Sequence, residues 1–130
     1  PASAFVAGFI GKVAFLPAEV AGVDEHCTVR VRGRTFTLPR FSPDLNAGDS
    51  ALVMCRPESL TLLPPGEGIL DGKITTNVYL GHSIESFVST EMGEILVQVD
   101  NPDARQIFAE GEPVSVSFIP ELTKALPPEE

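Results

Sequence analysis

The dipeptide Gly72-Lys73 makes a nucleotide-binding site the first chemistry to consider in this sequence. A phosphate-binding loop needs the pattern G-x-x-x-x-G-K-[ST], in which the glycines allow a tight backbone cradle and the hydroxyl binds magnesium. Here Glu67 stands at the first glycine position and Ile74 stands at the hydroxyl position. Both the cradle and the magnesium ligand are missing, so the sequence predicts no ATP site in this chain.

The histidines and cysteines lack the spacing of a zinc site. His26 directly precedes Cys27, which places their side chains on opposite faces of a strand, and Cys55 forms no C-x-x-C pair. His82 follows Gly81 and is predicted to lie in a surface turn. No G-x-S-x-G nucleophile motif occurs. We expect no catalysis, no metal and no cofactor in this chain, and two reduced cysteines packed in its interior.

The net charge of −9 is unevenly distributed along the chain. Residues 1–63 contain six basic and six acidic residues, whereas residues 64–130 contain three and twelve. An acidic surface repels phosphate backbones. A basic cluster in the first half could by itself suggest a nucleic-acid-binding module; it consists of Arg30, Arg32, Arg34 and Arg40. It lacks interleaved aromatic residues for base stacking, so we expect a solvated strand face and no nucleic-acid partner.

The tripeptide Arg56-Pro57-Glu58 follows a short apolar run. Proline lacks a backbone donor, so Pro57 should end a strand. The flanking Arg56 and Glu58 could be solvated charges at this strand end, or they could contact another domain across a fixed bend. The sequence leaves both interpretations open.

The hydrophobic periodicity is that of strands. Val29 and Val31 alternate with polar residues before Gly33, and Phe36 and Leu38 alternate after it, which predicts a hairpin. Further short strands are predicted at residues 51–55, 94–99 and 114–118, with a second hairpin around Gly93. No stretch shows a convincing apolar stripe of helical period, and no apolar run approaches the length of a membrane span. The predicted fold class is therefore all-β, with no direct membrane insertion.

The second half of the chain repeats the first. A shift of 63 residues aligns Gly48 with Gly111 and Pro57 with Pro120, within NAGDSALVMCRPESLTLLP and AEGEPVSVSFIPELTKALP. The Pro- and Gly-rich residues 63–68 are interpreted as a linker. We expect an internal duplication that gives two small OB-like barrels, residues 1–65 and 66–130, because closed barrels leave no open sheet edges. Periodicity alone does not distinguish these barrels from a sandwich.

The order of several short motifs resembles the C-terminal TOBE region of the ATP-binding subunits of ABC importers. The motifs are Phe5–Gly11, which is similar to the segment leaving the ATPase domain, Cys55-Arg56-Pro57-Glu58, Val78-Tyr79-Leu80-Gly81, and the pattern of Gly111, Val114 and Val116. The resemblance covers residues 5–126. It implies tandem OB-like barrels, in which the first strand, Phe5–Leu16, could be shared between the units.

The resemblance also implies a function and a set of partners. This chain would be a regulatory and dimerising domain cut from a cytoplasmic ATPase subunit at the inner face of the membrane. ATP and magnesium would bind in the missing ATPase domain, and permease subunits would be contacted through the parent protein. The imported solute would be ferric iron or a polyamine. Contacts with a second copy are expected at Arg56, Pro57, Glu58, Tyr79, Leu80, Gly81, His82 and Ser83.

An alternative function is the sensing of a small oxyanion such as molybdate or tungstate, which related barrels hold between units. Backbone donors near Gly81-His82-Ser83, or else Lys12 and Lys73, could bind such an anion. The acidic second half of the chain argues against this alternative.

Overall fold

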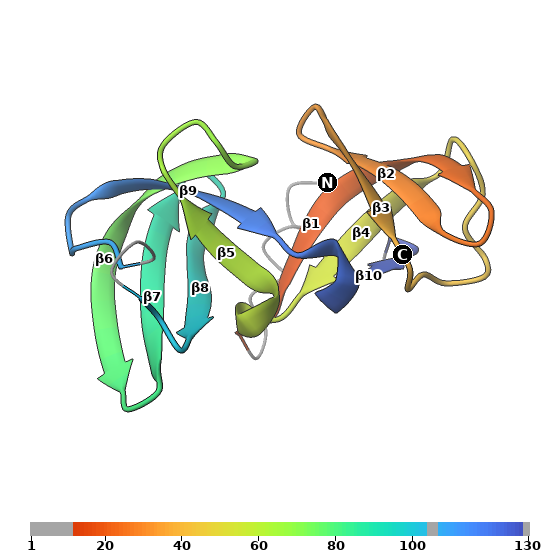
Figure 1. The fold of residues 1–130 in the computed structure, drawn as a ribbon. Coiled ribbons are helices and arrows are strands. Elements are labelled where there is room, and N and C mark those ends of the chain that lie inside the picture. Colours follow the sequence, from red (N-terminus) through yellow and green to blue (C-terminus); the bar gives the residue numbers. More distant parts are fainter. Residues whose placement is uncertain (1–11, 104–106, 129–130) are drawn as a thin grey trace. The chain divides into compact units, whose positions relative to one another are not determined.

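The structure is a computed structural model that describes residues 12–103 and 107–128 (Figure 1). The chain divides into two compact units. Unit 1 consists of Pro1–Arg56 and Ile119–Glu130, and unit 2 consists of Pro57–Phe118. Both are built from antiparallel strands, which confirms the predicted all-β class.

Unit 1 contains a five-stranded sheet in the order β10-β4-β1-β2-β3. Its strands are β1 (Ala14–Val23), β2 (Cys27–Val31), β3 (Arg34–Leu38), β4 (Ser50–Cys55) and β10 (Lys124–Leu126). After β3 the chain turns back to the opposite edge, where Phe41 forms a parallel bridge with Ala125. The Ala125 N–H also donates a hydrogen bond to the Arg40 carbonyl at 3.1 Å. These contacts curl the sheet around its core, as in a small barrel.

Unit 2 repeats this arrangement with the strand order β5-β9-β6-β7-β8. Its elements are the 3₁₀ turn η2 (Pro57–Ser59), β5 (Leu60–Leu63), β6 (Leu70–Leu80), β7 (Ser83–Thr90), β8 (Gly93–Asp100) and β9 (Pro113–Phe118). Strands β4 and β9, which the 63-residue shift superposes, have the same sequence of buried and exposed positions. The predicted tandem of OB-like units is therefore confirmed.

The last strand of each repeat lies in the sheet of the other unit. Strand β5 follows β4 in the chain but pairs with β9, and β10 follows β9 but pairs with β4. The chain therefore crosses between the units at Arg56/Pro57 and again at Phe118/Ile119. The second crossing continues into the 3₁₀ turn η4 (Pro120–Leu122), the counterpart of η2 in the repeat.

This exchange differs from the sequence-based boundary at residues 65/66. The stretch interpreted as a linker, residues 63–68, is a turn that joins β5 to β6 inside unit 2, where Glu67 N–H donates to the Pro64 carbonyl. The described part of the first strand, β1, pairs with β2 and β4 of unit 1, so the exchanged element is the last strand. Residues Phe5–Gly11 lie outside the described part of the chain. Local composition marks turns but carries no information about which distant strand a segment joins.

The Gly-acid pair at Gly48-Asp49 ties a turn to the central strand of unit 1. Gly48 has a φ of +92° and donates its N–H to the Val20 carbonyl at 2.8 Å. In return, Val20 N–H donates to the Asp49 carbonyl at 2.8 Å. The Asp49 carboxylate closes the turn by accepting the Asn46 N–H at 2.8 Å. The register of β1 against β2 shifts between Val20 and Gly22, so this turn holds the strand where it is irregular.

Unit 2 repeats the same set of contacts. Gly111, with a φ of +86°, donates to the Ile74 carbonyl at 2.7 Å, and Ile74 N–H donates to the Glu112 carbonyl at 3.0 Å. The Glu112 carboxylate accepts the Ala109 N–H at 2.8 Å. The register of β6 shifts directly after Ile74. The sequence match between the two Gly-acid pairs therefore reflects the same turn, with the same hydrogen bonds to the central strand, in both units.

The first prediction concerns this turn. Replacing Gly48 with Ala should lower the free energy of unfolding by about 1–2 kcal/mol, because a Cβ is strained at a φ of +92°. Gly22→Ala is the matched control, since its φ is not positive and its added Cβ meets no atom within 4 Å. Urea denaturation of both variants checks this, and equal losses in the two would contradict it.

The second prediction concerns the exchanged strand. Truncation after Phe118 removes β10, whose Ala125 is fully buried between Val53 and Phe41, and should unfold unit 1 although the deletion lies far from β1–β4 in sequence. Truncation after Leu126 is the control. Amide hydrogen exchange should show lost protection across β1–β4 only in the shorter protein; retained protection there would contradict the exchange.

Candidate interaction site

The tripeptide Arg56-Pro57-Glu58 forms the crossing from unit 1 into unit 2. Strand β4 ends at Cys55 and Pro57 opens η2, which confirms the prediction that this proline ends a strand. Arg56 and Glu58 are exposed, and neither side chain makes a hydrogen bond or ion pair with another described residue. Next to them Ser59 is buried, so the turn is anchored while its two charges face solvent.

The equivalent crossing, η4, has the same 3₁₀ geometry with different chemistry. Ile119 replaces the arginine and is exposed, as is Leu122. The turn is closed by Thr123, whose hydroxyl donates to the Pro120 carbonyl at 2.9 Å. The shared proline thus serves the geometry of the crossing; Glu121 is the counterpart of Glu58, so only the arginine is particular to the first crossing.

The residues Tyr79–Ser83 form the tip of the hairpin between β6 and β7 (Figure 1). Leu80 and Ser83 pair across a two-residue turn made by Gly81, with a φ of +68°, and His82. Tyr79 is 66% exposed and Leu80 is 51% exposed, so two adjacent large side chains at the tip face solvent. The exposed His82 lies in the turn, as predicted.

Asn77 fixes the base of this hairpin. Its side-chain amide donates to the Phe108 carbonyl at 2.8 Å and its side-chain oxygen accepts from the Ser86 hydroxyl at 2.6 Å. Its backbone N–H donates to the Glu110 carboxylate at 2.9 Å. Sequence analysis missed this residue. The available signal was an asparagine inside a strand, where asparagine is disfavoured unless its side chain has a specific partner.

The structure does not bring the predicted residues together into one site. Among the described residues, no hydrogen bond or ion pair connects Arg56–Glu58 with Tyr79–Ser83. The proposed anion ligands are also separated: Lys73 lies in β6 with the turn at the far end of that strand, about 25 Å away at roughly 3.3 Å per residue. Lys73 and the Gly81-His82-Ser83 turn, which are alternative anion ligands, therefore lie at separate places on unit 2.

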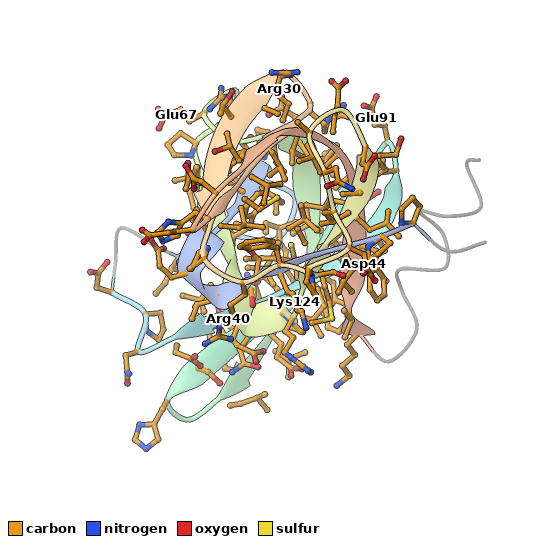
Figure 2. All side chains as sticks on the ribbon, turned by 90° about the vertical axis from the view of Figure 1, so that its right-hand side faces the viewer. Arg30, Arg40, Asp44, Glu67, Glu91 and Lys124 are labelled. Carbon is orange, nitrogen blue, oxygen red and sulfur yellow. The ribbon has the colours of Figure 1, made fainter. Side chains whose placement is uncertain are left out.

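The arginines of unit 1 do not form one patch. Arg30 makes an ion pair with Glu19 across the β1–β2 pairing, with an N–O distance of 3.3 Å. Figure 2 shows Arg30 and Arg40 at well-separated places on the molecule, with Lys124 close to Arg40. Arg40 therefore lies apart from Arg30 and is not part of a single cluster with it.

Both cysteines are free and buried, in agreement with the sequence prediction. Cys27 begins β2 and Cys55 ends β4, so they lie against opposite ends of β1. Burial raises the pKa of both thiols, that of Cys55 to about 12. Within residues 12–103 and 107–128, no group of three His, Cys, Asp or Glu side chains could hold a metal ion. In the same part of the chain, no helix has the length and apolar character needed to cross a membrane.

The duplicated five-stranded sheets and the exposed hairpin define a tandem OB-like domain. The TOBE domain family matches residues 53–126, which is more than half of the sequence. The chain therefore belongs to the TOBE domain family.

Its relatives include proteins named as importer subunits. The spermidine/putrescine import ATP-binding protein PotA of Ruegeria pomeroyi is 36% identical over 97% of this chain and 35% of its own length. The Fe(3+) ions import ATP-binding protein FbpC of Brucella abortus is 34% identical over 91% of this chain and 32% of its own length. The chain thus spans about a third of the length of these curated relatives.

A solved structure supports the fold independently. The cytoplasmic molybdate-binding protein ModG, in a crystal form with molybdate bound, superposes with a TM-score of 0.61 and 16% sequence identity. The match covers 88% of this chain and 95% of that chain. At this identity the likeness establishes the shared OB-like fold.

The third prediction concerns Cys55. Its unfolded thiol ionises around pH 9.0 while the folded thiol stays neutral to about pH 12. Its contribution to stability is therefore complete below pH 9 and is lost as the pH rises towards 12, at up to about 1.4 kcal/mol per pH unit. Urea denaturation at pH 8, 9 and 10 should show that the free energy of unfolding falls more steeply with pH for the native protein than for Cys55→Ala. Other titrating groups are common to both proteins, so parallel pH profiles would contradict the prediction.

Proposed function

We propose that this chain is the accessory domain of the ATP-binding subunit of a binding-protein-dependent ABC importer, placed C-terminal to the ATPase domain. The observation that carries the proposal is the extent of the matches. Relatives named as import ATP-binding proteins align with nearly all of this chain, yet the chain accounts for only about a third of their length. The remaining two thirds of such a protein would supply the site for ATP and magnesium, so this domain itself is not an ATPase.

The accessory domain would act by association. It would help to hold two ATP-binding subunits together, on the cytoplasmic face of the membrane, while the parent protein contacts the permease subunits. The exposed charges of Arg56 and Glu58 at the first crossing and the apolar hairpin tip at Tyr79 and Leu80 are surfaces available for such contacts.

In this proposal the other subunits of the transporter select the imported solute. Relatives named for spermidine and putrescine and relatives named for Fe(3+) match this chain at 36% and 34% identity. Import of a polyamine or of ferric iron is therefore the proposed activity of the whole transporter. This domain contacts neither solute in the proposal.

Oxyanion sensing is the second candidate, and the OB-like fold shared with ModG is compatible with it. The acidic second half of the chain, with twelve acidic and three basic residues, weighs against it. Calorimetric titration of the chain with molybdate, tungstate and sulfate distinguishes the two candidates. Saturable heat at micromolar concentrations would favour sensing, whereas heats no larger than dilution favour the accessory role.

The fourth prediction tests the accessory role directly. In the R. pomeroyi PotA relative, this chain replaces the matching third, and uptake of labelled putrescine is measured in cells that lack the native subunit. We expect the chimera to restore uptake above a truncated protein that lacks this third.

The control chimera carries the charge reversal Arg56→Glu with Glu58→Arg at the exposed crossing. Because neither side chain has a partner among the described residues, this change should leave the fold intact and reduce uptake only if the crossing makes a contact. A parent chimera that performs no better than the truncated protein, although expressed and folded, would refute the accessory role.

A further inference from the structure

We propose that the open edge of β6 at the hairpin tip pairs, antiparallel and about a twofold axis at Tyr79, with the same edge of a second copy of this chain. The pairing would place Tyr79 opposite Tyr79 of the second copy, and Val78 opposite Leu80 of the second copy. This inference rests on the proposed association of two subunits and assigns it a definite surface.

The edge of β6 is open on the side away from β7. On that side, β9 pairs with β6 only from Leu70 to Lys73, and among the described residues no strand continues beyond it. The β6–β7 hairpin extends further, to the turn after Leu80. An unpaired strand edge is a ready template for pairing with another chain.

The backbone of Tyr79 points towards this open edge. Leu80 and Ser83 close a two-residue turn, so the N–H and C=O of Leu80 face β7 and those of Tyr79, one residue earlier, face away. Asn77 supports the same orientation, because its N–H bonds the Glu110 carboxylate on the side opposite β7. The N–H and C=O of Tyr79 are therefore both available for a partner strand.

Glu110 sets the limits of the pairing. Its carboxylate occupies the Asn77 N–H, so a partner strand cannot continue towards Ile74. This leaves Val78–Leu80 as the paired segment and centres it on Tyr79. In a twofold arrangement the two copies of Glu110 lie at opposite ends of this segment, where their charges do not meet.

The distribution of charge favours a second copy as the occupant. Unit 2 contains ten acidic and two basic residues, so most self-contacts of this unit would bring like charges together. From Ile74 to Ile84 the hairpin contains no Asp, Glu, Lys or Arg. The proposed register joins apolar side chains on each face, with Val78 beside Leu80 on one face and the two Tyr79 rings on the other.

A disulfide trap tests the register. In the proposed pairing Tyr79 forms a hydrogen-bonded pair with itself, with a Cα–Cα distance of about 5.5 Å, which suits a disulfide. Oxidation of the Tyr79→Cys chain with copper phenanthroline should give a covalent dimer on a non-reducing gel. Leu80→Cys is the matched control, because it is similarly exposed but lies opposite Val78 and not opposite itself. Its dimer should form roughly tenfold more slowly, since its two thiols lie beyond disulfide distance.

The double variant Tyr79→Cys with Leu80→Asp gives the second readout. A carboxylate on each paired face should abolish the disulfide while the circular dichroism spectrum stays that of a folded β protein. Equal dimer formation by the Tyr79→Cys and Leu80→Cys chains, or an undiminished disulfide in the double variant, would overturn the proposed edge pairing. Restored uptake by the chimera described above, with no selective Tyr79 disulfide, would leave the accessory role standing and remove this surface alone.

Discussion

The reciprocal hydrogen bonds between each Gly-acid turn and the central strand of its sheet are the constraint on which the rest of the structure depends. In unit 1 the pair of bonds joins Val20 to Gly48 and Asp49, and in unit 2 the corresponding pair joins Ile74 to Gly111 and Glu112. Each turn leads directly into the buried strand β4 or β9, so fixing the turn also fixes where that strand starts. A sheet must bend to enclose a core, and a register irregularity of the kind that bends a strand lies next to these bonds in both units.

At the two crossings the chain passes from one unit to the other, and the strand that follows each crossing completes the sheet it enters. Because β5 completes the sheet of unit 2 and β10 completes that of unit 1, each repeat supplies an element that the other requires. Small units of this size bury little surface alone, and mutual completion adds cooperativity without adding residues. The surfaces proposed for contacts with other subunits lie outside this framework. The hairpin tip extends beyond the strand that supports its base, and Arg56 and Glu58 project from a turn whose neighbouring residue is buried.

Sequence reasoning recovered the parts of the fold that are encoded locally. The alternation around Gly33 and Gly93, the buried strand before Pro57 and the duplication all follow from residue type and spacing, and the structure contains each of them. The exchange of β5 and β10 was missed, because strand pairing depends on contacts between residues far apart in sequence. Residues 63–68 have the composition of a linker, yet the same glycines and prolines also suit the tight turn that they form. The network around Asn77 was missed for a similar reason, since its partners come from β7 and from the loop before β9.

The order in which the strands are made has a consequence for biosynthesis. A ribosome releases β1 to β4 first, but among the described residues the edge of β4 away from β1 pairs only with β10, which is synthesised after all of unit 2. During that interval the apolar strand β4 presents an unpaired edge to other nascent chains. The short length of β4 and the charged residues that follow it would limit such pairing during this interval. The duplicated domain therefore becomes a finished structure in one late step, and unit 1 cannot mature ahead of unit 2.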